Sequence, residues 1–434
     1  MKKPKRIVTT PFDRYKVPPK QNLLIMPLLW IYCWAVTRKG KLRISKVRMK
    51  GLKPPYLVLG SHHAFMDFYI TPLAIFPHRA NYVSELEGFE AYGEWAYRQI
   101  GCLGTRKFVN DMALVKNIKK VMDRKGIIVL YPEARYANVG TNSKLPESTG
   151  KLAKMLKVPV VVINMKGNYL LSPIWNLAAR KGVKLETTIT QVYTREELAL
   201  ATVPEINEKL QEFLMYDEYA WQEETKQAIA YEKRAVGIEL VLYQCPVCRK
   251  EFQMASDKAD LFCCCCGERW HMTEYGKMDR ASSISDRTSN APSVYDADSL
   301  NIPDWYEWQR NQVEKEIEEG NYFLNMKVHI EALPNAVNFI DLGDGILQHD
   351  RNGFELIFTE YGESENKTLH FPTNTMNSIH TEYEYRGKGQ CVTLSTVDNT
   401  YFLFPRGEGF NATKIQFAAE YFYEAAAVRK FLST

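Results

Sequence analysis

The sequence predicts three folded parts: an α/β domain, a small cysteine-rich unit and a β-rich domain that ends in a helix. In the first half, short apolar runs typical of buried strands alternate with stretches of helical periodicity, at 55–60, 126–131 and 158–164. Two closely spaced cysteine pairs follow. Beyond Tyr322, short alternating runs are separated by Gly, Asn and Asp, and a helical stretch covers 414–432.

Composition and charge place the chain among ordinary globular proteins with an unusual basic end. Its 434 residues are 45% hydrophobic and 25% charged, and this length predicts two to four domains. The first 50 residues hold fourteen Lys or Arg and one acid, Asp13, so their net charge is +13 and that of the remainder is −8. Such a segment indicates an anionic partner surface, either membrane or nucleic acid.

An apolar run of fourteen residues, 23–36, lies inside this basic end. It is shorter than the about 20 residues that cross a bilayer as a helix, and Pro27 interrupts it. It ends at Arg38 without a small-residue cleavage site, so we do not interpret it as a secretory signal. We expect an interfacial anchor on the cytoplasmic side of a membrane, held by aromatic rings and by flanking cations attracted to anionic lipid. The alternative is a core helix.

The residues after the first buried run carry the candidate chemistry. That run ends at Gly60, so His62 lies at the carboxyl end of a strand, where open α/β sheets place ligands. On one continuous helix, His62 and Asp67 would point about 140° apart. Contact therefore requires His62 to precede the helix and Asp67 to lie in its first turn. A carboxylate there would orient His62 as a general base toward an alcohol. The alternative is a capping or core histidine.

Two later stretches complete a recognisable pattern. One buried run leads into Tyr-Pro-Glu-Ala-Arg at 131–135, and the next begins Val-Pro-Val-Val at 158–161. In this order with His-x4-Asp, the pattern over residues 20–215 resembles the glycerolipid acyltransferases, specifically the 1-acyl-sn-glycerol-3-phosphate acyltransferase family. The resemblance implies a central mixed sheet flanked by helices, with His62 as catalytic base and Asp67 as the acid that orients it.

The same resemblance assigns the residues that place the acceptor. The family's Gly-x5-Arg block resembles residues 101–107, with a lysine where the family has arginine and an arginine just before it. The family's Phe-Pro-Glu-Gly-Thr-Arg block resembles 131–135, without the Gly-Thr and with the arginine one residue closer. Alternatively, the cations are solvated surface charges and the glutamate caps a helix. By the resemblance, the substrate-binding residues are Arg106, Lys107, Glu133 and Arg135.

The implied reaction is transfer of an acyl group from a thioester to a hydroxyl. The acceptor is a lysophospholipid, with 1-acyl-glycerol-3-phosphate converted to phosphatidate, and the donor is acyl-CoA or an acyl carrier protein thioester. An esterase is a third possibility, but the chain has no Gly-x-Ser-x-Gly elbow. The alternative from another class is a non-catalytic membrane or nucleic-acid adaptor on a degenerate acyltransferase fold.

The two Cys-x2-Cys pairs, separated by fourteen residues, predict a structural zinc ribbon over 241–278. Cys264 and Cys265 fall inside the second pair and cannot join the same tetrahedron, whereas His271 is an alternative to one cysteine. Disulfides are the other interpretation, which the missing signal sequence disfavours. No dense basic flank accompanies this unit, so we do not expect nucleic acid as a partner. The predicted zinc ligands are Cys245, Cys248, Cys263 and Cys266.

The remaining patterns give the expected order of secondary structure. Helices are predicted over 85–100 and 111–124, an edge strand over 183–193, and one long helix over 205–233. The expected domains are 1–40 (membrane interface), 41–215 (acyltransferase), 216–240 (helical spacer), 241–278 (zinc ribbon), 279–302 (Ser-rich linker) and 303–434 (β-rich domain).

The last domain is expected to begin with a helix from Pro303 to Glu319. About seven strands and the final helix follow, a pattern that resembles the pleckstrin-homology or GRAM-type β-sandwich. Those folds often bind lipid head groups, but a fold does not establish a function. Because this region has no basic cluster for a phosphoinositide, we expect a docking or regulatory module.

Overall fold

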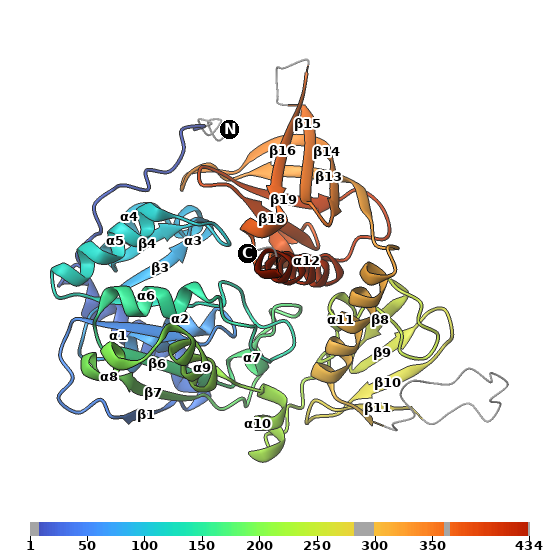
Figure 1. Ribbon diagram of the computed structural model, residues 1–434. Helices are drawn as coiled ribbons and strands as arrows, with labels where there is room; N and C mark the ends of the chain where they lie inside the picture. Colours follow the sequence, from blue (N-terminus) through green and yellow to red (C-terminus); the bar gives the residue numbers. More distant parts are fainter. Residues whose placement is uncertain (1–7, 282–298, 360–364, 433–434) are drawn as a thin grey trace, which may run out of the picture.

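The computed structural model describes residues 8–281, 299–359 and 365–432, in three sheet-containing units (Figure 1). The first unit carries β1 to β7, the second β8 to β12 and the third β13 to β19. In Figure 1 they lie at the left, the lower right and the top. Most of the Ser-rich linker predicted at 279–302 lies outside the described residues.

The first unit is built on a seven-stranded mixed sheet in the order β1-β7-β6-β2-β5-β3-β4. Only the β6–β7 pair is antiparallel. The predicted mixed sheet with flanking helices is therefore confirmed. The strands are β1 (Arg43–Val47), β2 (Tyr56–Gly60), β3 (Asn81–Glu85), β4 (Cys102–Thr105), β5 (Ile127–Leu130), β6 (Val160–Lys166) and β7 (Glu186–Tyr193).

Helices cover both faces of this sheet, which explains why β2 is apolar at every position. Successive strand side chains point to opposite faces. Tyr56 and Val58 pack with α2, α3 and α4, whereas Leu57 and Leu59 pack with α5, α6, α8 and α9. The helices are α1 (Ile25–Thr37), α2 (Met66–Ala74), α3 (Leu86–Tyr92), α4 (Glu94–Gln99), α5 (Met112–Asp123), α6 (Ser148–Leu156), α7 (Asn168–Leu171), α8 (Arg195–Leu200), α9 (Val203–Leu214) and α10 (Glu218–Glu224).

Three of the predicted elements were wrong in extent or position. The helix expected over 85–100 is two helices, because Gly93 between them has a φ of 89°. The strand expected at the edge is β7, which lies between β1 and β6. The long helix expected over 205–233 ends at Leu214, and Asp217 then caps the shorter α10 by accepting from Ala220 N at 2.9 Å.

The cysteine-rich unit is a small antiparallel sheet in the order β12-β11-β10-β9-β8. Its last two strands flank the residues outside the described part, and Met278 pairs with Leu300. The strands are β8 (Met254–Asp257), β9 (Asp260–Cys263), β10 (Arg269–Met272), β11 (Met278–Arg280) and β12 (Ser299–Leu300).

The third unit begins with α11 (Ile302–Glu318) and ends with α12 (Ala412–Leu432). Between them lies one antiparallel sheet of seven strands in the order β16-β15-β14-β13-β19-β18-β17. Seven strands and a final helix were predicted, and the described residues confirm both; the likeness to a pleckstrin-homology sandwich stays a prediction. The strands are β13 (Leu324–Ala332), β14 (Ile340–Asp350), β15 (Gly353–Thr359), β16 (Asn366–Pro372), β17 (His380–Glu382), β18 (Cys391–Ser395) and β19 (Thr400–Pro405).

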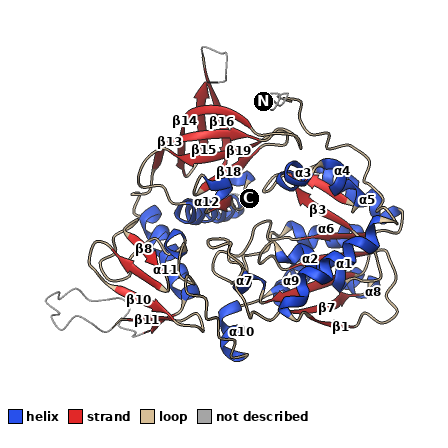
Figure 2. Cartoon of the chain, turned by 180° about the vertical axis from the view of Figure 1, so that it is seen from behind, coloured by secondary structure: helices blue, strands red, loops and turns tan. Residues whose placement is uncertain are grey.

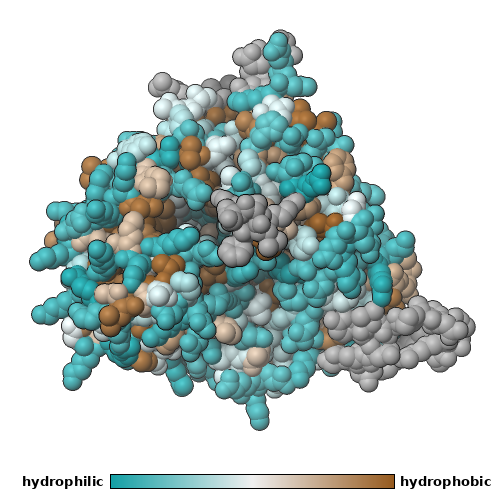
Figure 3. All heavy atoms as spheres, in the orientation of Figure 1, coloured by the Kyte–Doolittle hydropathy of each residue, from teal (hydrophilic) through white to brown (hydrophobic). Residues whose placement is uncertain are grey.

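The three units share buried cores. Trp175 of the first unit, Trp270 of the second and Phe417 of α12 belong to one continuous apolar cluster. Phe402 and Phe404 of β19 join the core on the α2 face of the first sheet. Figure 2 shows the same three units from behind, with α12 between the third sheet and the rest. Apolar side chains also surface over the first unit, at the left of Figure 3. None of the described helices has the length and apolarity that crossing a bilayer requires.

Candidate active site

His62 and Asp67 are in contact at the carboxyl end of β2. The chain leaves β2 at Gly60, His62 lies in the loop, and Asp67 lies in the first turn of α2. The two side chains meet at 3.1 Å between Nδ1 and Oδ2. The structure therefore shows the arrangement that the spacing required, with the histidine before the helix and the carboxylate inside it.

The Asp67 carboxylate is fully buried and surrounded by donors. Its Oδ2 accepts from His63 N at 2.6 Å and from Ala64 N at 3.2 Å, and its Oδ1 accepts from Asn168 Nδ2 at 2.6 Å. These bonds fix the carboxylate and with it the ring of His62. Asn168 lies on α7, and nothing in the sequence connected it with the site.

Two tyrosines hold the His62 ring. Tyr131 stacks on it with centroids 4.4 Å apart, and Tyr136 contacts it at 4.5 Å. The Tyr131 ring fits because residue 60 is glycine, where a Cβ would lie 2.5 Å from a ring carbon. The opposite ring nitrogen of His62, Nε2, has no hydrogen-bond partner within the described residues. That nitrogen is therefore free to accept a proton.

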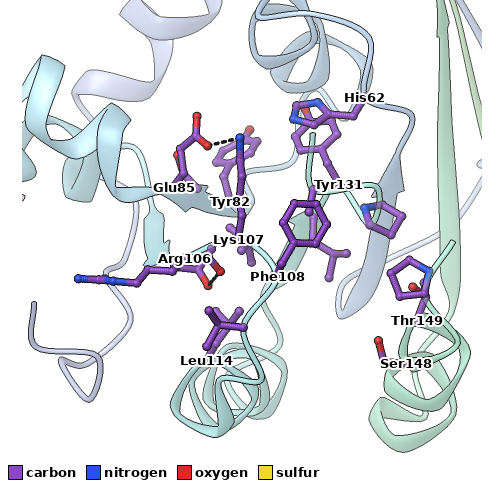
Figure 4. A pocket seen from close by; sticks show the side chains of 18 of the residues that line it. His62, Tyr82, Glu85, Arg106, Lys107, Phe108, Leu114, Tyr131, Ser148 and Thr149 are labelled. Atoms are coloured by element: carbon purple, nitrogen blue, oxygen red, sulfur yellow. Dashed lines mark hydrogen bonds and ion pairs between the residues drawn. The ribbon is translucent and has the colours of Figure 1, made fainter. Parts of the chain in front are cut away.

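His62 lines a cavity of about 350 Å³ whose wall is mostly apolar (Figure 4). Phenylalanines and aliphatic side chains from α2, β3, α5, β5 and α6, and from the chain just before α2 and α5, form the apolar part. A volume of this size is within the range of ligand pockets. The apolar wall includes Phe65, Phe68, Val83, Phe108, Leu114, Val115, Ile118, Leu130 and Leu152.

Glu133 is buried behind the site and does not line the cavity. It accepts from His62 N at 3.0 Å and from Ser143 N at 2.7 Å. Burial raises the pKa of Glu133, while these two bonds lower it less. Contact with an acceptor stays a prediction for Glu133; the structure shows it binding the backbone of the loop that carries His62.

Arg106 and Arg135 both bind the third unit. Arg106 borders the cavity, but its guanidinium points away from His62 and donates to the carbonyls of Leu333, Pro334 and Asp398 at 2.7 to 3.2 Å (Figure 4). Arg135 pairs with Glu420 at 2.6 Å and does not line the cavity. Their binding to a substrate phosphate also stays a prediction.

Lys107 is the predicted cation whose charged group faces the cavity. It forms an ion pair with Glu85, and its Nζ lies 3.1 Å from a ring nitrogen of His380. Burial raises the pKa of Glu85, but the charge and hydrogen bond of Lys107, together with the charges of His380 and His62, lower it more, so the pKa is lowered overall. Figure 4 shows this pair on one side of the cavity, with His62 and Tyr131 on the other.

A second buried pair lies directly behind the site and was not predicted. His63 Nδ1 is 2.7 Å from Glu218 Oε1, and neither side chain is exposed. Burial lowers the pKa of His63, but the hydrogen bond and charge of Glu218 outweigh it and raise the pKa. Glu218 also accepts from Gly167 N, so α10 is fixed to the rest of the first unit. The sequence gives no signal for a pair so far apart along the chain.

The four predicted cysteines come together. Their sulfur atoms all lie within 4.8 Å of one another, and none forms a disulfide. Sγ atoms are 3.7 Å apart both between Cys245 and Cys266 and between Cys248 and Cys263. This group could hold a metal ion. His271, the alternative ligand, instead contacts Asp260 and Arg234.

Comparisons with known proteins give little sequence similarity. No family model matches the chain, and no curated protein matches it. Among solved structures, the chain is similar to the crystal structure of the 1-acyl-sn-glycerophosphate (LPA) acyltransferase PlsC from Thermotoga maritima. The identity is 14%, and the similarity covers 46% of this chain and 80% of that one at a TM-score of 0.39. The function proposed below rests on the geometry of the site.

Proposed function

We propose that this protein is an O-acyltransferase that moves an acyl group from a thioester to a lipid hydroxyl, with His62 as general base. The observation that carries the proposal is the His62–Asp67 pair, which directs a free Nε2 at an apolar cavity. Such a pair suits proton removal from an alcohol, and the cavity suits an acyl chain.

In the proposed reaction, His62 and Asp67 are sufficient to account for every proton transfer. The acceptor hydroxyl gives its proton to His62 Nε2 while its oxygen attacks the thioester carbonyl carbon. The tetrahedral intermediate collapses by breaking the carbon–sulfur bond, and the thiolate recovers the proton from His62. Asp67 stabilises the imidazolium that exists between the two transfers. CoA and acyl carrier protein are the proposed donors, and 1-acyl-glycerol-3-phosphate is the first acceptor to test.

An anionic membrane surface is the proposed partner, and α1 is the element that would contact it. Met26 and Cys33 face inward, whereas Leu24, Leu28 and Ile31 are 84%, 65% and 62% exposed. The cations that follow α1 are also exposed, from Arg38 to Lys50. Apolar side chains beside lysine and arginine suit the boundary of an anionic bilayer.

A run of aromatic contacts leads from this surface to the cavity. Tyr32 of α1 contacts Tyr69 at 5.8 Å, and Tyr69 contacts Phe65 at 5.5 Å. Phe65 lines the cavity that contains His62. A lipid substrate can therefore pass from the membrane to the site along an apolar surface.

The metal proposed for the four cysteines is zinc. A tetrahedral ion with zinc–sulfur bonds of about 2.3 Å requires sulfurs about 3.8 Å apart. Two of the six sulfur–sulfur separations are 3.7 Å and fit that requirement, and all six lie within 4.8 Å. Four thiolates leave no open position, so we propose a structural role for the ion.

The test is acyl transfer by the purified protein with labelled lysophosphatidate or monoacylglycerol and acyl-CoA or acyl carrier protein thioester. We expect product from the native protein and a loss of at least about 100-fold in kcat for His62→Ala. His370→Ala is the matched control, because His370 is 64% exposed on β16. Equal turnover by both variants would contradict the mechanism, and vesicle binding without turnover would favour the adaptor.

A further inference from the structure

Two of the three predicted phosphate-binding cations are occupied in holding the third unit. The Arg106 guanidinium is buried against three backbone carbonyls from two loops of that unit. Arg135 is enclosed by Glu420 and by Ser378, whose Oγ lies 2.9 Å from it. These contacts belong to a buried interface, because β19 shares a core with the first sheet.

Lys107 is the remaining cation, and its charge is already balanced. Glu85 pairs with it from inside the cavity, and His380 contacts it from β17. A phosphate monoester carries nearly two negative charges and is bound best by arginine forks. In this cavity a phosphate monoester would contact one lysine and, beside that lysine, the carboxylate of Glu85.

One segment of the third unit, residues 375–380, forms a wall of the cavity and makes two of these contacts. Thr375 and Asn377 line the cavity, Ser378 binds Arg135 and His380 contacts Lys107. The catalytic site is therefore composite, with the base on the first unit and part of the wall on the third.

The polar groups free to bind a substrate are uncharged. Within the described residues, eight polar side chains that line the cavity make no hydrogen bond, and all are hydroxyls or amides. Such groups recognise hydroxyls by donating and accepting. They are Tyr82, Ser84, Tyr97, Asn110, Tyr136, Ser148, Thr149 and Asn377.

We propose that the acceptor has an uncharged head bearing hydroxyls, as in a monoacylglycerol, and that Asn377 of the 375–380 segment helps to select it. The proposal rests on the acyltransferase function proposed above and names its acceptor class. Arg106 and Arg135 then act as anchors for the third unit, and the Lys107–Glu85 pair disfavours a phosphate monoester.

The first experiment compares monoacylglycerol with lysophosphatidate of the same acyl chain, each with the same thioester donor in neutral detergent. We expect kcat/KM for monoacylglycerol to be at least about tenfold higher. A preference for lysophosphatidate would overturn this inference and leave the proposed acyl transfer intact. Acylation of neither acceptor with either donor would contradict the function and the inference together.

The second experiment separates recognition from structure. Asn377→Ala should raise the KM for monoacylglycerol about 2-fold to 10-fold, as expected for one lost hydrogen bond, with kcat and the donor KM unchanged. Asn374→Ala is the matched control, because Asn374 is exposed, lies three residues earlier and does not line the cavity. Thermal unfolding checks that both variants are folded. An unchanged acceptor KM in folded Asn377→Ala would overturn the role of Asn377.

Discussion

Glu420 joins two arginines at the interface between the first and third units. Arg135 is 2.6 Å from one carboxylate oxygen and Arg310 is 2.5 Å from the other, while Ser378 donates at 2.6 Å. Burial alone would raise the pKa of Glu420, but the two guanidinium charges outweigh it and lower the pKa to about 2. A carboxylate held in this way contributes to stability only while it is ionised.

This residue gives a pH prediction whose direction is fixed by its pKa. In the unfolded chain the pKa of Glu420 is near its ordinary value of 4.5, and in the folded chain it is about 2. The contribution of Glu420 is therefore present above about pH 4.5 and is lost as the pH falls toward 2, about 3 kcal/mol in all. We expect the stability deficit of Glu420→Gln, measured by thermal unfolding, to shrink over that range.

Glu424→Gln is the control for this prediction. Glu424 lies one helical turn later on α12, is 56% exposed and pairs with the exposed Lys144. An exposed ion pair contributes little to stability, so the small stability deficit of Glu424→Gln should stay constant with pH. A Glu420→Gln deficit that does not change between pH 4.5 and 2 would show that Glu420 is not held in its charged form.

Contacts between neighbouring residues were readable from the sequence, and contacts across the fold were not. His62 and Asp67 are five residues apart, so helix geometry alone predicted that their contact requires His62 before the helix and Asp67 in its first turn. Glu218 contacts His63 from α10, much later in the same unit, and Glu420 contacts Arg135 from the third unit. No local pattern marks such pairs. This is why the sequence predicted cations at the site but not that two of them hold another unit.

At the scale of elements, apolar periodicity identified helices but not where they break. The helix predicted over 111–124 matches α5, because Asp111 caps it and no residue interrupts it. The pattern over 85–100 continues through Gly93, which the periodicity alone does not reveal as a break. Strand order is likewise not local: β7 alternates like an edge strand, but β1 pairs with its outer side.

The α1 helix carries the membrane prediction at this scale. Its exposed apolar side chains would leave water on binding a bilayer, and each is worth about 1.5 kcal/mol or more when buried. Replacing Leu28 and Ile31 together by glutamate should therefore weaken binding to anionic vesicles by at least about tenfold, as measured by sedimentation.

The control for this surface is Leu200→Glu. Leu200 is 87% exposed, so it is as accessible as the α1 residues, but it ends α8, which packs on the other face of the sheet. We expect vesicle binding by this variant to equal that of the native protein. If the α1 variant also binds normally, α1 is not the membrane-contacting element.

At the scale of the whole molecule, the cysteine-rich unit packs against the two helices of the third unit. Gln309 of α11 binds Val241 O at 2.9 Å, and Lys414 of α12 binds Glu251 at 2.8 Å. Trp270 of this unit packs against Trp305 with ring centroids 4.9 Å apart. The four cysteines therefore stabilise a unit on which the placement of α11 and α12 depends.

Loss of the proposed metal should consequently weaken substrate binding at the proposed active site. Cys245→Ser removes one of the four sulfurs, so we expect loss of bound zinc and a lower thermal midpoint. We also expect weaker acceptor binding, because the 375–380 segment of the cavity wall belongs to the third unit. Cys264→Ser is the matched control, since Cys264 is exposed, lies inside the second cysteine pair and is not one of the four. Zinc content, thermal midpoint and acceptor KM measured on both variants decide the matter. If Cys245→Ser loses zinc but keeps its thermal midpoint and its acceptor KM, the cysteine-rich unit does not support the composite site.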